Sequence, residues 1–462
     1  MIRFLWINAL DPLSEVETRY PNLGIGYLVA SLRAAFGEDA FSFRVVNSEI
    51  DEVLEQFRPD VVGISAVSQN YGRAVRHAAL ARQRGIAVLI GGVHISLLPH
   101  TLAPEMTVGC IGEGEETIVD LMKLFLERGG FSPDALASIS GIAYHGDDGS
   151  IRLTSPRTPR TDLDTIPYPA RDILEITSHT YLFTSRGCPY RCAFCASSRF
   201  WDKVRFFSAE RVVDEVELLV TNHDARFISF FDDLFVADRK RFFRIVELLE
   251  ERGIAGKVKF SCSLRANTVT AEVVKGLKRM GVGSVEMGLE SGNQRVLTLL
   301  KGKGISIQQN REAVRLLRAN GIMPNASFII GAPDETEEEI LDTLRFIKSV
   351  DLGLFDVYAL TPFPGTPVWE LAKGRRLVSE GPAMDWSRLN VNFEVAHQKA
   401  IILSEILSRD DILRLYRKFR RYRLLHNIMT IWRHPMLSDL PRFAFKMLRE
   451  WIGRMGRLGT AC

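Results

Sequence analysis

Short apolar runs alternate with helical patterns over the first 130 residues of the chain. Five runs are rich in β-branched and apolar residues: RFLWIN, SFRVVN, DVVGIS, AVLIGG and TVGCIG. Segments with a helical spacing of apolar residues, such as GIGYLVASLRAAF, separate these runs. Strands that alternate with helices form a parallel sheet covered on both faces. The pattern predicts a Rossmann-like (flavodoxin-like) domain over residues 1–135, with ligands at the carboxyl ends of its strands.

Small residues occupy the ends of these strands, where a ligand can approach the backbone. Together with one histidine they are Ser65, Gly91, Gly92, His94, Gly112 and Gly114. Glycine permits tight turns and close approach of another group. The same glycines are equally consistent with turns alone.

Residues 136–175 interrupt this rhythm, and a second series of strands and helices follows them. SISGIAYHGDDGSIRL predicts two short strands around a turn, and the next stretch holds four prolines, so we expect a hairpin and a linker. From 176 to 375 six runs recur: TYLFTS, ARFISFFD, KVKFSCSL, VGSVEMGLE, NASFIIG and FDVYALTPF. We favour a partial (β/α)6 barrel, whose chemistry would lie at the carboxyl ends of the strands. Periodicity alone also allows a second Rossmann-type sheet.

Composition sets limits on the class of protein. With 462 residues, 46% of them hydrophobic, the chain is long enough for two or three globular domains and is not a disordered or disulfide-stapled protein. No apolar run is long enough to span a membrane, and the first residues do not resemble a signal peptide. We expect a cytoplasmic protein, at most peripheral to the inner face of the membrane.

Three of the six cysteines fall within eight positions. Cys188, Cys192 and Cys195 form a C-x3-C-x2-C pattern directly after the first strand of the second series. Thiolates are the ligands of iron-sulfur clusters, and three of them on a four-iron cluster leave one iron open. Structural zinc would need a fourth ligand nearby. We expect Cys110 and Cys262 to be buried strand residues.

This loop resembles that of the radical S-adenosylmethionine (SAM) enzymes, whose hallmark is C-x3-C-x-aromatic-C; the aromatic residue here is Phe194. The resemblance implies that SAM binds the open iron of a [4Fe-4S] cluster. It also implies reductive cleavage of SAM to a 5′-deoxyadenosyl radical, which abstracts hydrogen from a substrate. A flavodoxin- or ferredoxin-type protein would supply the electron.

The resemblance assigns SAM contacts to residues at later strand ends. Asp232 or Asp233, in FFDDLF, would meet the SAM amino group or orient nearby donors; the competing interpretation is a cap of the next helix. Arg265, in SLRANT, would pair with the SAM carboxylate, and a surface ion pair is its alternative.

Two further motifs extend these assignments along the barrel. Glu290 and Ser291, in GLESGNQRVL, would approach the ribose and methionine parts of SAM. Gly331, in FIIGAPDET, would receive the adenine through backbone hydrogen bonds.

The first domain resembles the cobalamin-binding domain of one large subgroup of radical SAM enzymes. The segments that carry this resemblance are PNLGIGYLVASLRAAF, DVVGISAVSQNYGRAV, VLIGGVHISLLPHTLAPE and GCIGEGEETIVDL. The resemblance makes the small residues at its strand ends cobalamin contacts. The D-x-H-x-x-G motif that supplies a lower cobalt ligand elsewhere is absent. His94 is the lone candidate, and we expect it to be a turn or surface residue, so cobalamin would lack a histidine ligand.

Cobalamin in this setting implies C-methylation of a small-molecule or lipid-like substrate. Rearrangement, cyclisation or oxidation without methyl transfer are the alternatives within the subgroup. A cobalamin- or RNA-binding regulatory protein with a silent barrel is the alternative from another class. A second cluster, as in methylthiotransferases, is disfavoured because the first cysteine is Cys110.

The C-terminal region, residues 376–462, is predicted to form basic amphipathic helices. Residues 412–462 hold 12 Lys or Arg and 2 Asp or Glu, a balance of +10. The net charge of the chain is +3, so the rest carries −7. Such helices suit an anionic membrane surface or an acidic partner, or they pack on the barrel with a solvated basic face. Nucleic acid is not expected as a partner; an RNA-modifying enzyme would depend on this tail alone.

Overall fold

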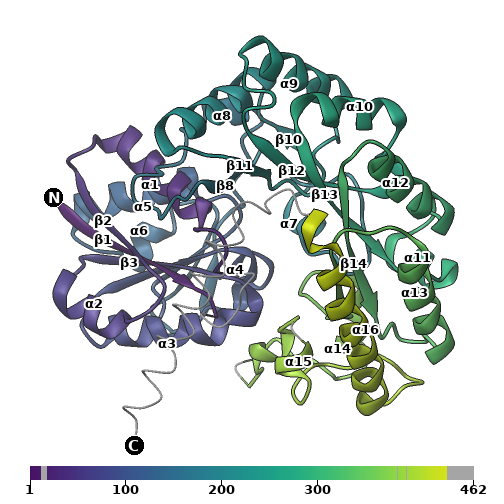
Figure 1. Cartoon of the computed structure of the whole chain (residues 1–462). Helices are drawn as coiled ribbons and strands as arrows, with labels where there is room; N and C mark the ends of the chain where they lie inside the picture. Colours follow the sequence, from purple (N-terminus) through teal and green to yellow (C-terminus); the bar gives the residue numbers. More distant parts are fainter. Residues whose placement is uncertain (12–17, 382, 392, 434–462) are drawn as a thin grey trace, which may run out of the picture.

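The computed structural model describes residues 1–11, 18–381, 383–391 and 393–433. Figure 1 shows two α/β units side by side, an N-terminal sheet with helices on both faces and a curled sheet with helices along its outer side. The predicted fold class is confirmed: a Rossmann-like domain, a partial barrel of six parallel strands, and C-terminal helices.

The N-terminal sheet has seven strands in the order β2-β1-β3-β4-β5-β6-β7. Its strands are β1 (Ile2–Ala9), β2 (Phe41–Val46), β3 (Val61–Ala66), β4 (Ala87–Gly91), β5 (Val108–Cys110), β6 (Ile142–His145) and β7 (Ile151–Leu153). The first five are parallel in the flavodoxin-like order 2-1-3-4-5, in which the switch point for a ligand lies between β1 and β3.

The predicted hairpin belongs to this sheet and not to a linker. β6 pairs antiparallel with β5 and β7 pairs antiparallel with β6. Without β6, one edge of β5 would leave its backbone groups unpaired, and an added antiparallel strand satisfies them. The linker proper therefore starts after β7.

Helices cover both faces of the first sheet. They are α1 (Leu23–Phe36), α2 (Ile50–Phe57), α3 (Tyr71–Arg82), α4 (Val93–Leu97), α5 (Glu115–Arg128) and α6 (Pro133–Leu136). Apolar residues of α1 and α5 pack with Phe4 and Trp6 on one face. Those of α2 and α3 pack with Leu5 and Ile7 on the other. The alternation of core residues along β1 explains why a near-continuous apolar run forms a strand buried on both sides.

The second sheet has six strands in the order β15-β14-β13-β12-β11-β8, and every pair is parallel. Its strands are β8 (His179–Leu182), β11 (Phe227–Phe230), β12 (Lys259–Leu264), β13 (Val282–Glu290), β14 (Met323–Ile330) and β15 (Phe355–Ala359). A small antiparallel ribbon, β9 (Ser185–Arg186) with β10 (Arg205–Phe206), continues from β8. The alternative of a second Rossmann-type sheet is wrong, because the strand order never reverses.

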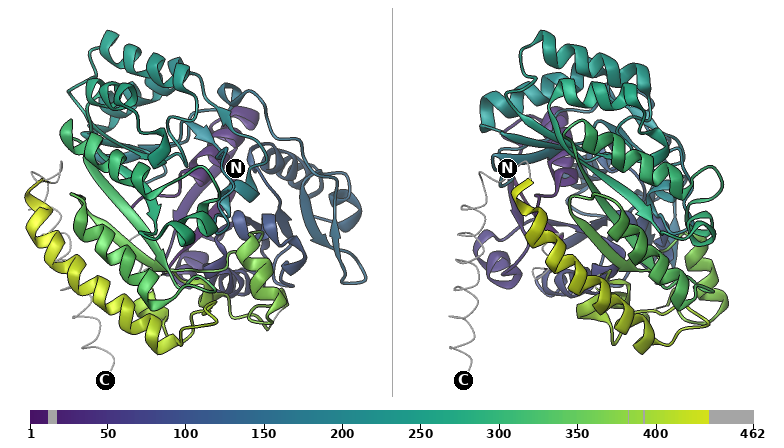
Figure 2. Two further views of the ribbon diagram at one scale, coloured as in Figure 1. Left: turned by 90° about the vertical axis from the view of Figure 1, so that its right-hand side faces the viewer. Right: turned by 45° about the vertical axis from the view of Figure 1, so that its right-hand side comes forward.

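Helices follow the strands along the convex side of this sheet, as both views in Figure 2 show. They are α8 (Ala209–His223), α9 (Arg239–Glu251), α10 (Ala271–Met280), α11 (Gln294–Lys301), α12 (Ile307–Ala319) and α13 (Glu337–Ser349). Polar side chains cap the N-termini of these helices; Ser306 and Thr336, for example, form capping boxes with Gln309 and Glu339. Asp238, and neither Asp232 nor Asp233, caps α9, so the helix-cap interpretation of the FFDDLF motif is wrong.

The C-terminal segments connect the two units. These are α14 (Pro367–Gly374), α15 (Phe393–Ala396) and α16 (Arg409–Thr430). A short helix of the barrel domain, α7 (Ser197–Phe200), follows the three cysteines. Trp369 and Trp386 belong to the same apolar core as Ile64 and Ile90 of the first sheet. α16 packs against the edge strand β15, as the alternative of helices packed on the barrel predicts. The last part of the predicted basic helical region, residues 434–462, lies outside the described residues. No described helix is long and apolar enough to cross a membrane.

Candidate active site

A cavity of about 450 Å³ lies where the carboxyl ends of the first sheet face the beginning of the barrel. The first sheet contributes all five small residues proposed from the sequence, Ser65, Gly91, Gly92, Gly112 and Gly114. The barrel contributes the residues on both sides of the cysteine loop, including Arg186, Gly187, Ser197 and Trp201, and the acidic pair Asp232 and Asp233. The structure thus brings the two motif regions together at one site.

The backbone at the floor of the cavity allows a ligand to approach it closely. Gly92 has φ 108°, and a Cβ there would lie 2.5 Å from the carbonyl oxygen of Ala66, so no other residue fits. Asn22, the N-cap of α1, donates to Ser65 Oγ (3.0 Å) and to Asn8 Oδ1 (3.1 Å). These bonds fix the strand ends at the β1/β3 switch point.

Two buried polar atoms at the cavity have no hydrogen-bond partner within the described structure. They are Trp6 Nε1 and Tyr27 Oη, and both side chains line the cavity. Burial raises the pKa of Tyr27, so its hydroxyl keeps its proton. A buried N–H or O–H without a partner is costly, and a ligand with hydrogen-bond acceptors would satisfy both. Cobalamin, with its broad apolar faces and peripheral amides, fits this lining.

The three cysteines lie half-buried on one loop between β9 and α7. Their thiols are close enough to interact electrostatically. Burial raises the pKa of Cys188 to about 11, so a cation is needed to hold it as a thiolate. Among the described residues, no group of three or more His, Cys, Asp or Glu side chains is arranged to hold a single metal ion. A four-iron cluster fits the loop better, since it binds each thiolate at a different iron.

Arg265 lies directly against the cysteine loop. Its Nη1 is 3.2 Å from Cys192 Sγ, its Nη2 donates to the Lys301 carbonyl (3.1 Å), and its guanidinium stacks on Tyr190 at 4.1 Å. Arg265 is buried, and its Nε has no partner among the described residues. The alternative prediction that Arg265 forms a surface ion pair is therefore wrong. An N–H donated to a ligand sulfur stabilises the reduced, more negative state of a cluster.

An Arg265→Gln variant is expected to bind iron but to cleave SAM about 10–100-fold more slowly. Loss of the N–H···S bond should also move the midpoint potential of the cluster to a more negative value. A redox titration followed by EPR measures this shift, and an unchanged potential would contradict the role given to Arg265. Arg239→Gln, an exposed arginine on α9, is the matched control.

Glu290 stands at the end of β13 in a strained backbone. Its φ is 60°, a left-handed conformation that costs a residue with a side chain about 1–3 kcal/mol and is characteristic of functional sites. Burial raises its pKa despite the neighbouring Lys301, whose Nζ lies 3.4 Å from Glu290 Oε1. Ser291 lies apart from this group: its Oγ is 3.2 Å from Thr343 Oγ1 and accepts from Asn293 N–H. The structure therefore places Ser291 as a link to α13.

The two adjacent aspartates have different surroundings. Asp232 is buried and accepts hydrogen bonds from Thr184 and Ser185, so it orients donors beside the cysteine loop and has no carboxylate oxygen free for SAM. Asp233 is exposed and accepts from Ser197 Oγ. Burial raises the pKa of the Asp232 carboxyl. Asp233 is thus the member of the pair that faces open space.

The glycine turn after β14 is already occupied by a side chain. The backbone N–H groups of Gly331 and Ala332 both donate to Glu335 Oε2, at 2.7 and 3.0 Å. Burial raises the pKa of Glu335 to about 7. The N–H of Gly331 is therefore engaged by Glu335 in this structure, and the adenine contact proposed for this turn stays a prediction.

His94 is neither a turn nor a surface residue. It is fully buried, stacks on Tyr71 at 3.8 Å, and meets the edge of Trp386. Its ring nitrogens are 3.1 Å from the hydroxyls of Ser68 and Thr101. It does not line the cavity. Both nitrogens are engaged, so His94 is no ligand for cobalt.

A His94→Phe variant is expected to lose less unfolding free energy than the wild type when the pH is lowered from 7 to 5. Burial lowers the pKa of His94 to about 3, below its usual 6.5, so folding favours the neutral ring. Stability is then lost as pH falls below 6.5, and this one residue accounts for about 2 kcal/mol between pH 7 and pH 5. Urea unfolding at the two pH values measures the difference. Equal losses in wild type and variant would contradict it.

A buried ion network ties the first domain to the cysteine loop. Arg186, two residues before Cys188, donates to Glu113 Oε1 (2.8 Å) and to Glu115. Arg205 donates to the same Glu113 (3.0 Å to Oε2). The three charged side chains Arg186, Glu113 and Glu115 are each only 10–11% exposed. This network fixes the loop against the end of β5.

Several of these residues could not be predicted from the sequence. Nothing near Arg186, Trp6, Tyr27 or Lys301 in the chain marks them, because their partners are remote in sequence. Cys262 is buried as expected, but Cys110 is only half-buried and lines the cavity. Phe194 packs against the core shared by the two units, so it anchors the loop.

Comparisons with known proteins agree with this architecture. The family model described as the radical SAM superfamily matches residues 182–347, and the B12 binding domain matches residues 11–122. An uncharacterized methyltransferase of Pyrococcus horikoshii is 33% identical over 81% of this chain and 82% of its own length. An anaerobic magnesium-protoporphyrin IX monomethyl ester cyclase of Rubrivivax gelatinosus is 27% identical over 90% and 77%. The solved structure of the radical SAM methyltransferase TsrM from Kitasatospora setae superposes with a TM-score of 0.66, 19% identity, and 82% and 79% coverage.

Proposed function

The chain belongs to the radical SAM enzymes that carry an N-terminal B12-binding domain, and from this we propose that it transfers a methyl group from SAM, by way of cobalamin, to a carbon of its substrate. One observation carries the proposal. The cavity at the β1/β3 switch point is bounded on its other side by the residues that flank the cysteine loop. A corrin held there would therefore lie next to the cluster.

The chain's own residues bind, orient and exclude water in this arrangement. Bound cluster and SAM supply a hydrogen-abstracting radical, and cobalamin supplies the methyl group. If cobalamin binds there, the side chains of Trp6 and Tyr27, whose polar atoms have no partner among the described residues, would be the donors available to it. Arg265 holds Cys192, and Phe183 and Phe231 border the cavity with apolar surface that keeps water away from a radical.

Deuterium-labelled SAM tests the proposal. Reduced, reconstituted protein given SAM with a CD3 group is expected to form both 5′-deoxyadenosine and S-adenosylhomocysteine, because one SAM is cleaved and another gives up its methyl group. Formation of 5′-deoxyadenosine alone would contradict methyl transfer. That outcome would favour the second candidate, a radical cyclisation or oxidation, which the 27% identity to the cyclase supports.

The substrate and the electron donor follow from the chemistry of the family. We propose a small-molecule or lipid-like substrate, with a flavodoxin- or ferredoxin-type protein as the donor. Phe183, Phe231 and Trp201 at the cavity support a substrate with a large apolar part.

A further inference from the structure

The outward face of α16 exposes a row of large apolar side chains near its C-terminal end. Leu424, Leu425, Ile428, Met429 and, just past the helix, Trp432 are 57–67% exposed. At about 100° per residue they lie on one side of the helix. We call these five residues the apolar row. Contiguous exposed apolar groups mark interaction surfaces.

The orientation of this helix is fixed by its opposite face. Phe419 is buried in the barrel core, and Tyr422 stacks on Phe355 of β15. His426 Nε2 lies 2.7 Å from the Gly353 carbonyl oxygen, and Arg423 pairs with Asp356. The helix therefore cannot turn to bury the apolar row in the barrel.

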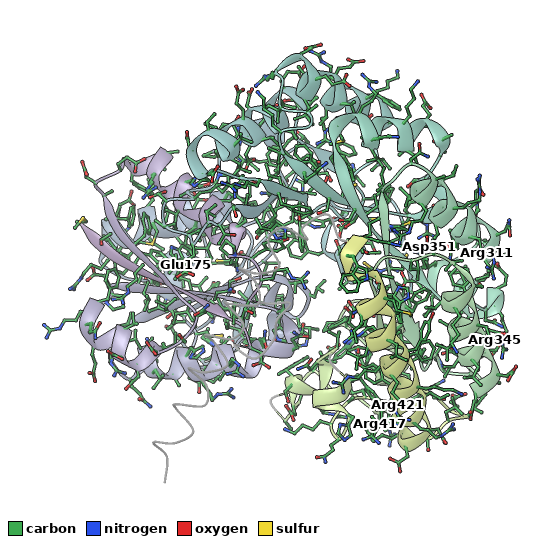
Figure 3. The ribbon with its side chains drawn as sticks, viewed as in Figure 1. Glu175, Arg311, Arg345, Asp351, Arg417 and Arg421 are labelled. Carbon is green, nitrogen blue, oxygen red and sulfur yellow. The ribbon has the colours of Figure 1, made fainter. Side chains whose placement is uncertain are left out.

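Cations precede the apolar row on the same side of the helix. Arg417, Lys418 and Arg421 are exposed, and Figure 3 labels Arg417 and Arg421 on α16. Neither of these two arginines has an ion-pair partner among the described residues. The residues before 412 carry most of the negative charge of the chain, a balance of −7, so the positive charge is local to this end. Residues 434–462 continue the same composition, with five Lys or Arg against two Asp or Glu.

We propose that the outward face of α16, the three cations and the apolar row together, binds the surface of an anionic lipid bilayer. Cations beside exposed Leu, Ile, Met and Trp match an interface of phosphate headgroups over acyl chains. Five apolar residues are too few for a stable protein interface, which takes about 20–30 residues a side. A nucleic acid would leave the apolar row in water.

Co-sedimentation of the full chain with vesicles tests this proposal. We expect binding to vesicles of phosphatidylcholine with phosphatidylglycerol, and little to phosphatidylcholine alone. Leu425→Glu/Ile428→Glu and, separately, Arg417→Glu/Arg421→Glu should each weaken binding about tenfold or more. Leu218→Glu, an exposed leucine on α8, is the matched control and should bind as wild type does. SAM cleavage without vesicles should be unchanged in all of them.

Three outcomes would overturn the proposal. One is equal binding by the wild type and both double variants, which would place the lipid contact elsewhere. Another is no binding to anionic vesicles by the full chain. The third is a wild-type dimer that either double variant converts to a monomer, which would assign the face to a second copy of the chain.

Discussion

A Cys192→Ala variant is expected to lose the iron-sulfur cluster and to lower the rate of 5′-deoxyadenosine formation by more than about a hundredfold. Loss of a ligand should exceed the 10–100-fold effect typical of residues that only support one. Cys192 is also the thiol that Arg265 contacts, so its removal leaves a buried guanidinium without its sulfur partner. Iron analysis and chromatography of the SAM cleavage products measure both effects.

Cys262→Ala is the matched control for this change. Cys262 is 2% exposed, lies inside β12, and has no place on the cysteine loop. The control should retain iron and SAM cleavage at close to the wild-type level. A Cys192→Ala protein with wild-type iron content and product would show that the loop does not hold the cluster.

An Arg186→Gln variant is expected to lose about 3–5 kcal/mol of unfolding free energy, because two buried carboxylates, Glu113 and Glu115, lose their shared cation. Burial tends to raise the pKa of Glu113, but Arg205 and Arg186 outweigh it and hold that pKa below its usual value. The charge on Glu113 therefore depends on these arginines. The variant should also bind cobalamin more weakly, since the loop borders the cavity.

Arg33→Gln is the matched control, because it removes an arginine from an exposed ion pair and not from a buried one. Arg33 pairs with Asp172, whose side chain is 61% exposed, and such pairs contribute less than about 1 kcal/mol. Urea unfolding at pH 7 compares the two variants. A loss at Arg186 no larger than that at Arg33 would mean that the ion network does not hold the two domains together.

Local patterns predicted most of the fold. The strands of both sheets follow from apolar runs between helical segments, and the cysteine spacing marked the loop without any tertiary information. The hairpin was predicted, but as part of the segment between the two domains and not as part of the first sheet. Its role depends on β5, which is about 30 residues earlier in the chain and needs a partner at its edge.

The roles of individual site residues were less predictable, because they depend on remote partners. His94 looks like a turn histidine until Trp386, almost 300 residues later, covers it. The sequence does not indicate that the N–H of Gly331 donates a hydrogen bond to the carboxylate of Glu335. Asp232 and Asp233 are adjacent and chemically identical, and only the packing of Thr184 and Ser185 makes one of them structural.

The absorption spectrum of protein purified without oxygen from cobalamin-fed cells tests whether this chain holds a corrin in the cavity next to the cluster. We expect cluster and corrin absorption in the same protein, with the corrin retained in the Cys192→Ala variant and the cluster lost. A spectrum that shows the cluster but no corrin, or a corrin that is lost together with the cluster, would contradict this expectation.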